Sequence, residues 1–498
     1  MSLTPGYQFH TPPYDHQRDV FHASKDDEFF GLLMQQGTGK SKVIVDTAAY
    51  LHLRDKIDAV VIIAPKGLYE NWINEDPEDF GQFPTHLHPS IRPYYLLWEN
   101  KTKNKTYRRK LELAADPPKG YDLTVMAVNI EAISAGRAHE YLMWFIRQRR
   151  CLLVVDESTK IKNRTSKRTK RTLELARLSG ALYRRILTGT PVTRSPLDAY
   201  PQFEFLQKNY FGQRTWSAFQ NRYAITELTQ IGGRRPFKKV VGYRRVEELA
   251  KLIQEHSYRV LRADCLDLPP KIYSKFQLEL APEQRKIYDR MKEHALAEYG
   301  DTTVAAPLVI TQMMKAHQIT CGYIIDDNKV VHRFFDEPAK NPRIAALLEL
   351  LETIDGKVII WANFVPCIED IYNALAEVYG RDAVRTYYGG TSDEDRKEAL
   401  RSFKREDGGA RFFISNQSTG GRGLTLTVAA TEVYYSNNYD LEERLQSEDR
   451  AHRIGQTKSL SIIDLVASNT VDGKIIRSLR SKNMMAATVT GDQLEDWI

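Results

Sequence analysis

The sequence predicts an α/β protein with two tandem parallel sheets, and three observations predict it. Short apolar runs rich in β-branched residues alternate with segments whose apolar residues recur at helical spacing, which is typical of parallel strands joined by crossover helices. This alternation occurs twice, and an aromatic-rich stretch between about residues 195 and 270 separates the two series. With 498 residues and 42% hydrophobic content, the chain is long and apolar enough to bury two cores.

Each expected element follows from a run of this kind. The first series contains five candidate strands, at residues 30–34, 59–64, 123–128, 151–155 and 185–188. The second series contains five more, at residues 357–362, 383–387, 411–415, 432–436 and 459–466. Helical spacing predicts packing helices over 285–299 and 341–353. We expect a first lobe over 1–270, with a helical insertion at about 195–265, and a second lobe over 271–498, with a helical insertion at about 280–340 and a C-terminal bracing segment.

The composition argues against several classes of protein. The longest apolar runs, such as 60–64, are far shorter than the roughly 18 residues of a membrane-spanning helix. No basic segment followed by an apolar core begins the chain, so we expect an intracellular protein of the cytoplasm or nucleoid (of the host cytoplasm if viral) without membrane association. The four cysteines lie far apart with no Cys-x-x-Cys pair, which argues against structural zinc and a disulfide framework.

A glycine-rich loop, QQGTGKS at 35–41, joins the first predicted strand to a helix. Its glycines let backbone N–H groups approach phosphate oxygens, its lysine places a cation on the β- and γ-phosphates, and its serine hydroxyl is a ligand for Mg²⁺. The candidate nucleotide ligands are Gly37, Thr38, Gly39, Lys40 and Ser41. The first glycine of the strict GxxxxGK[ST] pattern is missing, so a turn without a catalytic role is the alternative.

A buried strand that ends in two acids supplies the second half of such a site. Asp156 and Glu157 follow directly after the apolar residues 151–155. We expect Asp156 to hold Mg²⁺ together with Ser41, and Glu157 to orient and polarise the attacking water. An exposed acidic strand end is the alternative, but the two signals occur in the required order on neighbouring predicted strands. They predict a Mg²⁺-dependent nucleoside triphosphatase site.

Further motifs carry a resemblance to a known family. Leu187-Thr188-Gly189-Thr190-Pro191 follows the acidic strand, as in the amino-terminal lobe of superfamily two helicases. In the second lobe, Asp449-Arg450-Ala451-His452-Arg453-Ile454-Gly455-Gln456, preceded by Gln446, closely resembles the motif of Swi/Snf-type DNA translocases. The other matches, in the family's order, are Asn71-Trp72, Lys162-Asn163, Leu268-Pro269-Pro270-Lys271, Gly389-Gly390-Thr391-Ser392 and Gly420-Gly421-Arg422-Gly423-Leu424-Thr425-Leu426.

The resemblance implies two RecA-like lobes with ATP bound in the cleft between them. Gln17 would contact the adenine edge, and Arg450 and Arg453 would reach ATP from the second lobe, with Gln446 beside them in the catalytic set. An arginine finger changes the rate by on the order of 10³ to 10⁵, so hydrolysis would depend on lobe closure. A turn of three residues would couple the ATP site to the nucleic-acid path: Thr188, Gly189 and Thr190.

The expected track is double-stranded DNA. A motor that follows the backbone needs phosphate contacts rather than base readout. The resemblance would place seven residues on the DNA: Lys66, Asn129, Lys162, Asn163, Arg164, Gly421 and Arg422. These include the start of Lys160–Arg171, a run without acidic residues; beyond Arg164, a solvated helix face is the alternative.

Two departures from the family pattern qualify the resemblance. Ser158-Thr159 stand where a small residue and then histidine are more common, which puts coupling through that histidine in doubt, and Tyr439 stands where tryptophan is usual. We expect a monomeric DNA-dependent ATPase that translocates along duplex DNA. A strand-separating or annealing helicase is the second hypothesis. An ATP-gated nucleic-acid clamp or recruitment factor, in which hydrolysis only times release, is the alternative of another class.

Overall fold

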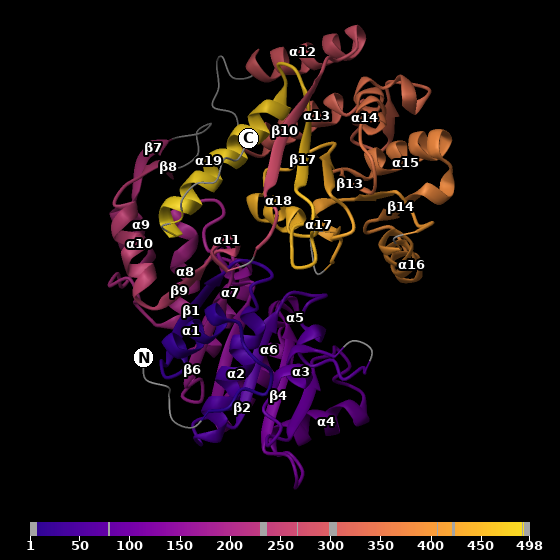
Figure 1. Ribbon diagram of the computed structural model, residues 1–498. Helices are drawn as coiled ribbons and strands as arrows, with labels where there is room; N and C mark the ends of the chain where they lie inside the picture. Colours follow the sequence, from indigo (N-terminus) through magenta and orange to yellow (C-terminus); the bar gives the residue numbers. More distant parts are fainter. Residues whose placement is uncertain are drawn as a thin grey trace. The chain divides into compact units, whose positions relative to one another are not determined.

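The computed structural model describes residues 7–77, 80–229, 237–265, 267–297, 306–405, 407–420, 424–490 and 492. These residues fall into two compact units (Figure 1). Unit 1 takes its residues from Met1–Ala224, Tyr243–Leu266 and Met485–Asp492, and unit 2 from Ile225–Gly242, Asp267–Met484 and Gln493–Ile498. Each unit contains a parallel sheet of its own.

Unit 1 is built on a seven-stranded sheet in the order β3-β4-β2-β5-β6-β1-β9. Its strands are β1 (Phe29–Met34), β2 (Ala59–Ala64), β3 (Pro93–Leu97), β4 (Leu123–Asn129), β5 (Cys151–Asp156), β6 (Tyr183–Leu187) and β9 (Ser257–Val260). All six neighbouring pairs are parallel. β2 is buried along its whole length and β5 up to Val155, which explains their uninterrupted apolar sequences.

Helices pack on this sheet, and their buried side chains form the hydrophobic core together with those of the strands. They are α1 (Asp15–Ser24), α2 (Lys40–Leu53), α3 (Gln82–His86), α4 (Lys105–Ala115), α5 (Ile130–Ala135), α6 (Arg137–Gln148), α7 (Lys167–Leu175), α8 (Ala199–Leu206), α9 (Trp216–Tyr223), α10 (Val246–Glu255) and α11 (Arg262–Cys265). One cluster joins Leu32, Val60 and Val154 of the sheet to Phe21 of α1 and Ile44 of α2. Alternate strand residues therefore face these two helices, and the loops at the strand ends remain available for a site.

Unit 2 is built on a six-stranded sheet in the order β10-β17-β16-β13-β15-β14, with all neighbours parallel. Its strands are β10 (Lys271–Leu278), β13 (Val358–Trp361), β14 (Val384–Tyr387), β15 (Phe412–Ser415), β16 (Thr431–Tyr434) and β17 (Leu460–Ala467). Its helices are α12 (Pro282–Ala297), α13 (Ala306–Thr320), α14 (Pro342–Glu352), α15 (Val365–Tyr379), α16 (Asp393–Lys404), α17 (Gln417–Gly420), α18 (Leu441–Glu448) and α19 (Val471–Thr490). Two clusters of buried side chains form its core, one of them around Ile360 and Leu347 and the other around Trp361 and Phe403.

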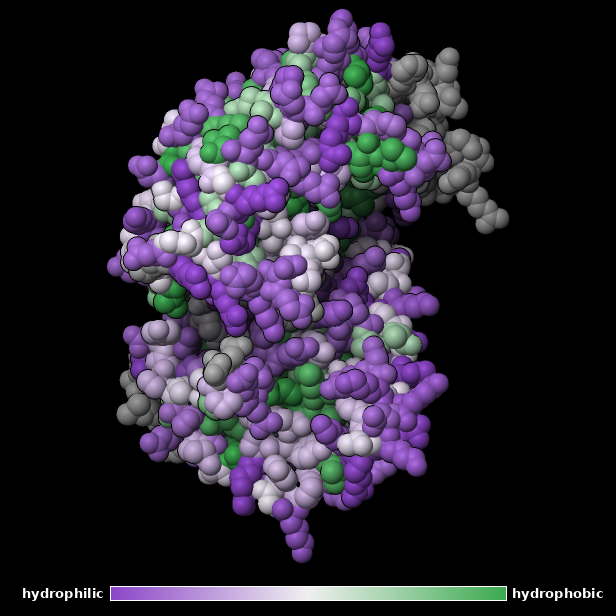
Figure 2. Space-filling model, turned by 90° about the vertical axis from the view of Figure 1, so that its right-hand side faces the viewer, coloured by the Kyte–Doolittle hydropathy of each residue, from purple (hydrophilic) through white to green (hydrophobic). Residues whose placement is uncertain are grey.

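Two short two-stranded sheets complete the described elements. β7 (Ala224–Thr229) pairs with β8 (Phe237–Tyr243), and β11 (Tyr323–Ile325) pairs antiparallel with β12 (Val331–Arg333). On the face drawn in Figure 2, hydrophilic side chains predominate and apolar residues occur in small groups, as is normal for a protein surface. Within the described ranges, no helix has both the length and the apolar content that crossing a membrane requires.

The predicted fold class, α/β with two tandem parallel sheets, is confirmed. All ten predicted strands are present, each with ends within two residues of the prediction, and the helices predicted at 285–299 and 341–353 correspond to α12 and α14. The sequence did not predict β3, β9 or β10. All three lie at sheet edges and are partly exposed. β9 and β10 mix polar and apolar residues, and β3 is a short run that begins with proline, so none has the long apolar run of a buried strand. β9 and the β7–β8 pair also bring strands into the stretch 195–265, which was predicted to be a helical insertion.

Candidate nucleotide-binding site

The phosphate loop lies between the end of β1 and the start of α2. Gly37 and Gly39 have φ values of +83° and +85°, a region that favours glycine. A Cβ on Gly39 would lie 2.1 Å from the side-chain nitrogen of Gln17, so this position also lacks space for a side chain. The hydroxyl of the buried Thr38 closes the turn by donating to the carbonyl of Gln35 at 2.7 Å. Local contacts therefore support this loop although the first glycine of the strict pattern is missing.

Two side chains of α1 hold the carbonyl of Thr38. The ring Nε2 of His16 donates to it at 2.8 Å, and the amide of Gln17 donates to it at 3.2 Å. The ring of Tyr14 stacks on His16 with centroids 5.8 Å apart and remains exposed. Gln17 therefore lies against the phosphate loop, and its contact with adenine stays a prediction.

Lys40 and Ser41 begin α2, a helix of 14 residues. The Nζ of Lys40 donates to the carbonyls of Met34 and Gln35 at 2.9 and 3.3 Å. Ser41 is half-buried in the first turn. Both residues stand at the positive end of the helix, where backbone N–H groups and the helix dipole attract phosphate oxygens.

The acidic pair stands at the carboxyl end of β5. The indole N–H of Trp72 donates to Oδ2 of Asp156 at 3.1 Å, and the backbone N–H of Glu157 donates to Oδ1 at 2.9 Å. Desolvation by burial raises the pKa of Asp156, whereas the charge of Lys40 and these hydrogen bonds oppose the shift. Glu157 has a φ of +49°, and its Oε1 accepts a hydrogen bond from Gln36 at 3.4 Å. Such strain in a non-glycine residue costs on the order of 1–3 kcal/mol and is concentrated at functional sites.

The turn after β6 packs on the phosphate loop. The backbone N–H of Thr188 donates to the carbonyl of Leu32 at 3.2 Å, and its hydroxyl oxygen accepts from the N–H of Thr190 at 3.1 Å. A Cβ on Gly189 would lie 3.2 Å from the Cα of Gln35, so the two backbones are in close contact. The structure thus brings the three predicted coupling residues against the phosphate loop. Their role in coupling stays a prediction.

A buried chain of hydrogen bonds links the acidic pair to the same turn. The hydroxyl of Ser158 donates to Oε1 of Gln202 at 2.7 Å, and the amide of Gln202 donates to the carbonyl of Pro191 at 2.6 Å. Both polar side chains are fully buried. Ser158 therefore connects the end of β5 to the turn after β6 through these hydrogen bonds. The neighbouring residue, Thr159, stands where the family pattern more often has a histidine.

Three predicted DNA contacts lie at the carboxyl edge of this sheet. Lys66 follows β2, Asn129 ends the neighbouring β4, and Lys162 follows β5 on the other side of β2. Lys66 is exposed. The side-chain oxygen of Asn129 caps α5 by accepting from the N–H of Glu131 at 2.7 Å, and the Nζ of Lys162 donates to the hydroxyl of Thr193 at 2.6 Å.

The remaining DNA candidates are divided between the two units. Asn163 and Arg164 form an exposed turn after Lys162, and the guanidinium of Arg164 lies 4.9 Å from the ring centroid of Trp216. Gly421 and Arg422 lie outside the described residues. At the end of the basic run, Arg171 donates to two backbone carbonyls in the last turn of α5 at 2.8 and 2.7 Å, which gives it a structural role.

In unit 2, the predicted catalytic residues gather at the end of α18. Nε of Arg450 donates to the carbonyl of Gln446 at 2.9 Å, and its Nη1 donates to the carbonyl of Leu424 at 3.1 Å. Nη1 of Arg453 donates to the same Leu424 carbonyl at 3.2 Å and to the hydroxyl of Thr425 at 3.0 Å. Both guanidinium groups therefore converge on one loop of this unit.

Two family models match the chain. The SNF2-related domain matches residues 23–322, and the helicase conserved C-terminal domain matches residues 342–455. The first match alone covers more than half of the 498 residues. The chain belongs to the SNF2-related family.

The SNF2-related chain is similar to curated proteins along most of its length. It is 23% identical over 463 residues to an uncharacterized ATP-dependent helicase of Mycoplasma genitalium, covering 92% of this chain and 40% of the relative. It is 24% identical over 489 residues to the putative ATP-dependent helicase/translocase YwqA of Bacillus subtilis, covering 94% and 47%. It is 28% identical over 349 residues to the DNA annealing helicase and endonuclease ZRANB3 of Mus musculus, covering 69% and 30%. The chain spans less than half the length of these relatives.

A solved structure is also similar to this chain. It is the Sulfolobus solfataricus SWI2/SNF2 ATPase core in complex with double-stranded DNA, with 20% identity, a TM-score of 0.41, and coverage of 99% of this chain and 96% of that one.

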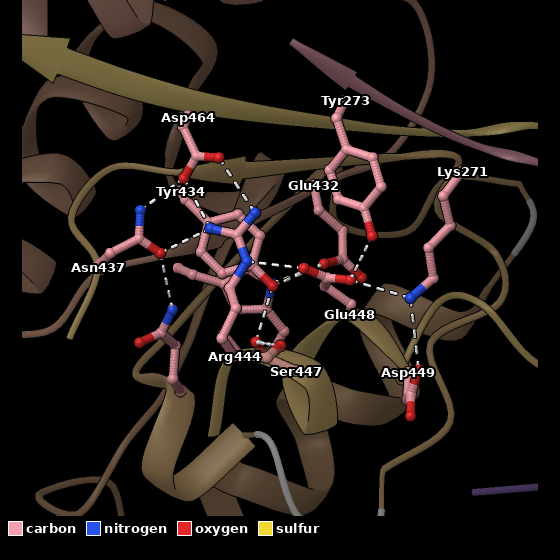
Figure 3. Close-up of polar contacts among 12 residues, drawn as sticks. Lys271, Tyr273, Glu432, Tyr434, Asn437, Arg444, Ser447, Glu448, Asp449 and Asp464 are labelled. Atoms are coloured by element: carbon pink, nitrogen blue, oxygen red, sulfur yellow. Dashed lines mark hydrogen bonds and ion pairs between the residues drawn. The ribbon is translucent and has the colours of Figure 1, made fainter. Parts of the chain in front are cut away.

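A buried network of charges supports α18 of the SNF2-related chain (Figure 3). Arg444 donates to Glu448 at 2.7 Å, to Asp464 at 2.6 and 3.1 Å, and to Asn437 at 2.6 Å. Its guanidinium also lies over the ring of Tyr434, 3.5 Å from the centroid. The network joins α18 to β16 and β17 and thereby fixes the helix that leads to Arg450.

The network extends to the first strand of the unit. Lys271, from the Leu268–Lys271 motif, donates to Glu448 at 2.9 Å, and Tyr273 donates to the same oxygen at 2.8 Å. Burial alone would raise the pKa of Glu448, but the charges of Lys271 and Arg444 override it and lower the pKa. Glu432 lies beside the network without an ion pair among the described residues, and burial together with the charge of Glu448 raises its pKa to about 8.

The residues of unit 1 fit Mg²⁺. The carboxylate of Asp156 and the hydroxyl of Ser41 are oxygen donors of the type that Mg²⁺ takes, together with several waters and phosphate oxygens. No group of three or more His, Cys, Asp and Glu residues in the described part of the chain is placed to hold a metal. A magnesium ion here would therefore depend on water and the nucleotide for most of its coordination.

Three side chains of this site have roles that were not predicted from the sequence. Trp72 was recognised as part of a motif, but nothing in that motif indicates its bond to Asp156. His16 belongs to no recognised sequence motif, so its contact with the carbonyl of Thr38 could not be predicted. Arg259 donates to the carbonyls of Leu33 and Gly189 at 2.9 and 2.7 Å and pairs with Asp492 at 2.7 Å. Its partners are up to 233 residues away, so sequence spacing could not reveal them.

Proposed function

We propose that this SNF2-related protein is a Mg²⁺-dependent ATPase that is stimulated by duplex DNA and translocates along it as a monomer. One observation carries the proposal: Lys40, Ser41, Asp156 and Glu157 converge at the carboxyl edge of one parallel sheet, with the turn of Thr188 packed directly on the phosphate loop. Relatives named as ATP-dependent helicases or translocases support it. A similar core in complex with double-stranded DNA is consistent with duplex as the track.

Each residue of the site has a role that follows from its chemistry. The backbone of the phosphate loop and Lys40 bind the β- and γ-phosphates. Asp156 and Ser41 hold Mg²⁺, which neutralises charge on the phosphates when bound. Glu157 orients the attacking water, and its strained backbone fixes the direction of its carboxylate. Arg450 and Arg453 stabilise charge that develops on the γ-phosphate.

The predicted track contacts fit a protein that follows the DNA backbone. Lys66, Lys162 and Arg164 supply cations at the strand ends next to the acidic pair. Cations that neutralise phosphates without reading bases give binding that tolerates any sequence and weakens with salt. The hydrogen bonds that join Ser158, Gln202 and the carbonyl of Pro191 offer a route by which a shift at the end of β5 moves the turn of Thr188 and Thr190.

The test is steady-state ATP turnover of the full chain with no nucleic acid, linear duplex DNA, single-stranded DNA or RNA, with Lys40→Ala and Glu157→Gln as controls. We expect strong stimulation by duplex DNA that both substitutions abolish. Displacement of a triplex-forming strand from the duplex would report translocation. Equal or stronger stimulation by single strands, with unwinding of a labelled fork, would instead establish the helicase, and nucleic-acid binding without stimulated turnover would establish the clamp.

A further inference from the structure

Unit 2 contains a cavity whose lining includes none of the residues assigned above. This cavity of about 940 Å³ is lined by residues of the edge strand β10, helices α12 and α13, the end of β17 and the first two turns of α19. Figure 1 labels these elements in unit 2. Its volume is at the upper end of the roughly 300–1,000 Å³ typical of ligand pockets. It is therefore large enough for several side chains of a bound segment.

The charges around this cavity are strongly one-sided. Four cations line it: Lys275 of β10, Lys292 of α12, and Lys474 and Arg477 of α19. Within the described ranges none of the four makes an ion pair or a side-chain hydrogen bond. The one acid in the lining, Glu279, already lies 3.7 Å from Arg285. Four cations therefore surround the cavity without a structural partner.

Apolar side chains form the inner surface of the cavity. Tyr288, Val471 and Ile476 are almost completely buried there, and Met291 and Met313 are partly exposed. Methionine side chains are flexible and polarisable, and they recur on surfaces that accept varied apolar partners. The lining thus combines an adaptable apolar interior with basic residues.

We propose that this cavity docks an acidic amphipathic segment of a partner protein. Apolar side chains of the segment enter between Met291, Met313 and Ile476, and its carboxylates pair with Lys275, Lys292, Lys474 and Arg477. Charge complementarity supports an anionic partner. The apolar interior favours a peptide over a nucleic-acid backbone, because a backbone that paired with the four cations would bring no apolar side chains to bury against Met291, Met313 and Ile476. The inference is independent of the proposed motor activity.

The experiment measures binding of synthetic peptides to the full chain by fluorescence anisotropy. The probes are 16-residue helical peptides with Leu, Phe or Trp on one face and Glu on the other, together with counterparts in which Lys replaces Glu or Ser replaces the apolar residues. The test variant is Lys474→Glu/Arg477→Glu. The matched control is Lys397→Glu/Arg401→Glu, which makes the same charge change at exposed positions of α16, packed on β14 at the opposite edge of the sheet.

We expect at least one acidic amphipathic peptide to bind saturably, and both counterpart peptides to bind much more weakly. The test variant should lose about tenfold in affinity, because two ion pairs become two repulsions, and the control should not change. Methyl signals of Met291 and Met313 should shift on binding. Absence of saturable binding, equal affinity of the two variants, or competition by a duplex oligonucleotide at equal concentration would overturn the proposal, the last in favour of a DNA contact.

Discussion

The charged residues at the phosphate loop of unit 1, Lys40 and Glu157, and those of the Arg444 network in unit 2 have different kinds of partner. We call the first group the loop edge. At the loop edge, the ammonium of Lys40 contacts backbone carbonyls, and the carboxylate of Glu157 contacts a neutral amide. In the network, Arg444 and Glu448 are almost completely buried and each is paired with opposite charge. The first arrangement places charged groups on the loop that is expected to bind phosphate, whereas the second uses charge to position a helix.

This difference separates activity from stability. Removing Lys40 leaves Asp156 with two neutral hydrogen-bond donors, the indole of Trp72 and the backbone N–H of Glu157, so the folded state should change less than when a member of the network is removed. Removing one member of the network leaves a buried charge without compensation, which is among the most destabilising changes known for a single side chain.

Replacing Lys40 with alanine should abolish activity and leave the fold intact. The ammonium is the cation expected on the β- and γ-phosphates, and loss of one such electrostatic contact lowers kcat by about 10²–10³ or more. The free energy of unfolding should change by less than about 3 kcal/mol, since the variant loses the hydrogen bonds of the ammonium to the carbonyls of Met34 and Gln35 and its attraction to Asp156. Turnover assays and urea denaturation measure the two quantities. A variant that is mainly unstable would break the comparison.

Replacing Arg444 with methionine should have the opposite effect. The substitution removes the partner of Asp464 and one partner of Glu448, both of which are fully buried. Breaking a buried pair in this way costs about 3–5 kcal/mol. Denaturant unfolding should show this loss, while Arg381→Met at an exposed position of the same unit should not. Equal stability of the two variants would contradict a structural role for the network.

Glu432 should make the stability of unit 2 depend on pH. Its pKa is raised to about 8 in the folded protein, so the folded state keeps this proton after the unfolded chain has lost it. Stability from this group is therefore fully present below about pH 4.5 and is lost as the pH rises through 8, by at most about 1.4 kcal/mol per pH unit. Unfolding of Glu432→Gln, measured from pH 5 to 8.5, should lack this component of the slope. An unchanged slope would show that Glu432 is not protonated in the fold.

The sequence predicted those parts of the fold whose cause is local. The runs that became β2 and β5 are uninterrupted because both faces of these strands are buried, and the phosphate loop follows from glycines at positions that need positive φ. The edge strand β10 was not predicted, since its alternation of polar and apolar residues depends on which face the sheet exposes. Local pattern carries that information only weakly.

The candidate site was predicted to a similar extent, and for the same reason. Lys40, Asp156 and Glu157 are recognisable because each follows a strand in a fixed order. The contacts of Trp72 with Asp156 and of Arg259 with Asp492 join residues 84 and 233 positions apart. Nothing in the spacing of such residues specifies that they meet, because packing of distant elements brings them together.

Trp72 gives the sharpest test, because the chain offers a matched control. Both Trp72 and Trp98 are 2% exposed, but the indole N–H of Trp72 donates to Asp156, whereas that of Trp98 has no hydrogen-bond partner among the described residues. Trp72→Phe keeps an aromatic ring and removes only the donor. Loss of a group that orients a metal ligand costs about 10–100-fold in metal affinity or activity.

We therefore expect Trp72→Phe to require about tenfold more Mg²⁺ for half-maximal turnover, with no comparable change in Trp98→Phe. Denaturant unfolding of both variants measures how much stability is lost when phenylalanine replaces the larger indole ring, an effect that both substitutions share. If both shift the Mg²⁺ requirement equally, the effect is one of packing and Trp72 does not position Asp156. A shift confined to Trp72→Phe would show that the indole N–H holds Asp156 in the position from which it binds the metal ion.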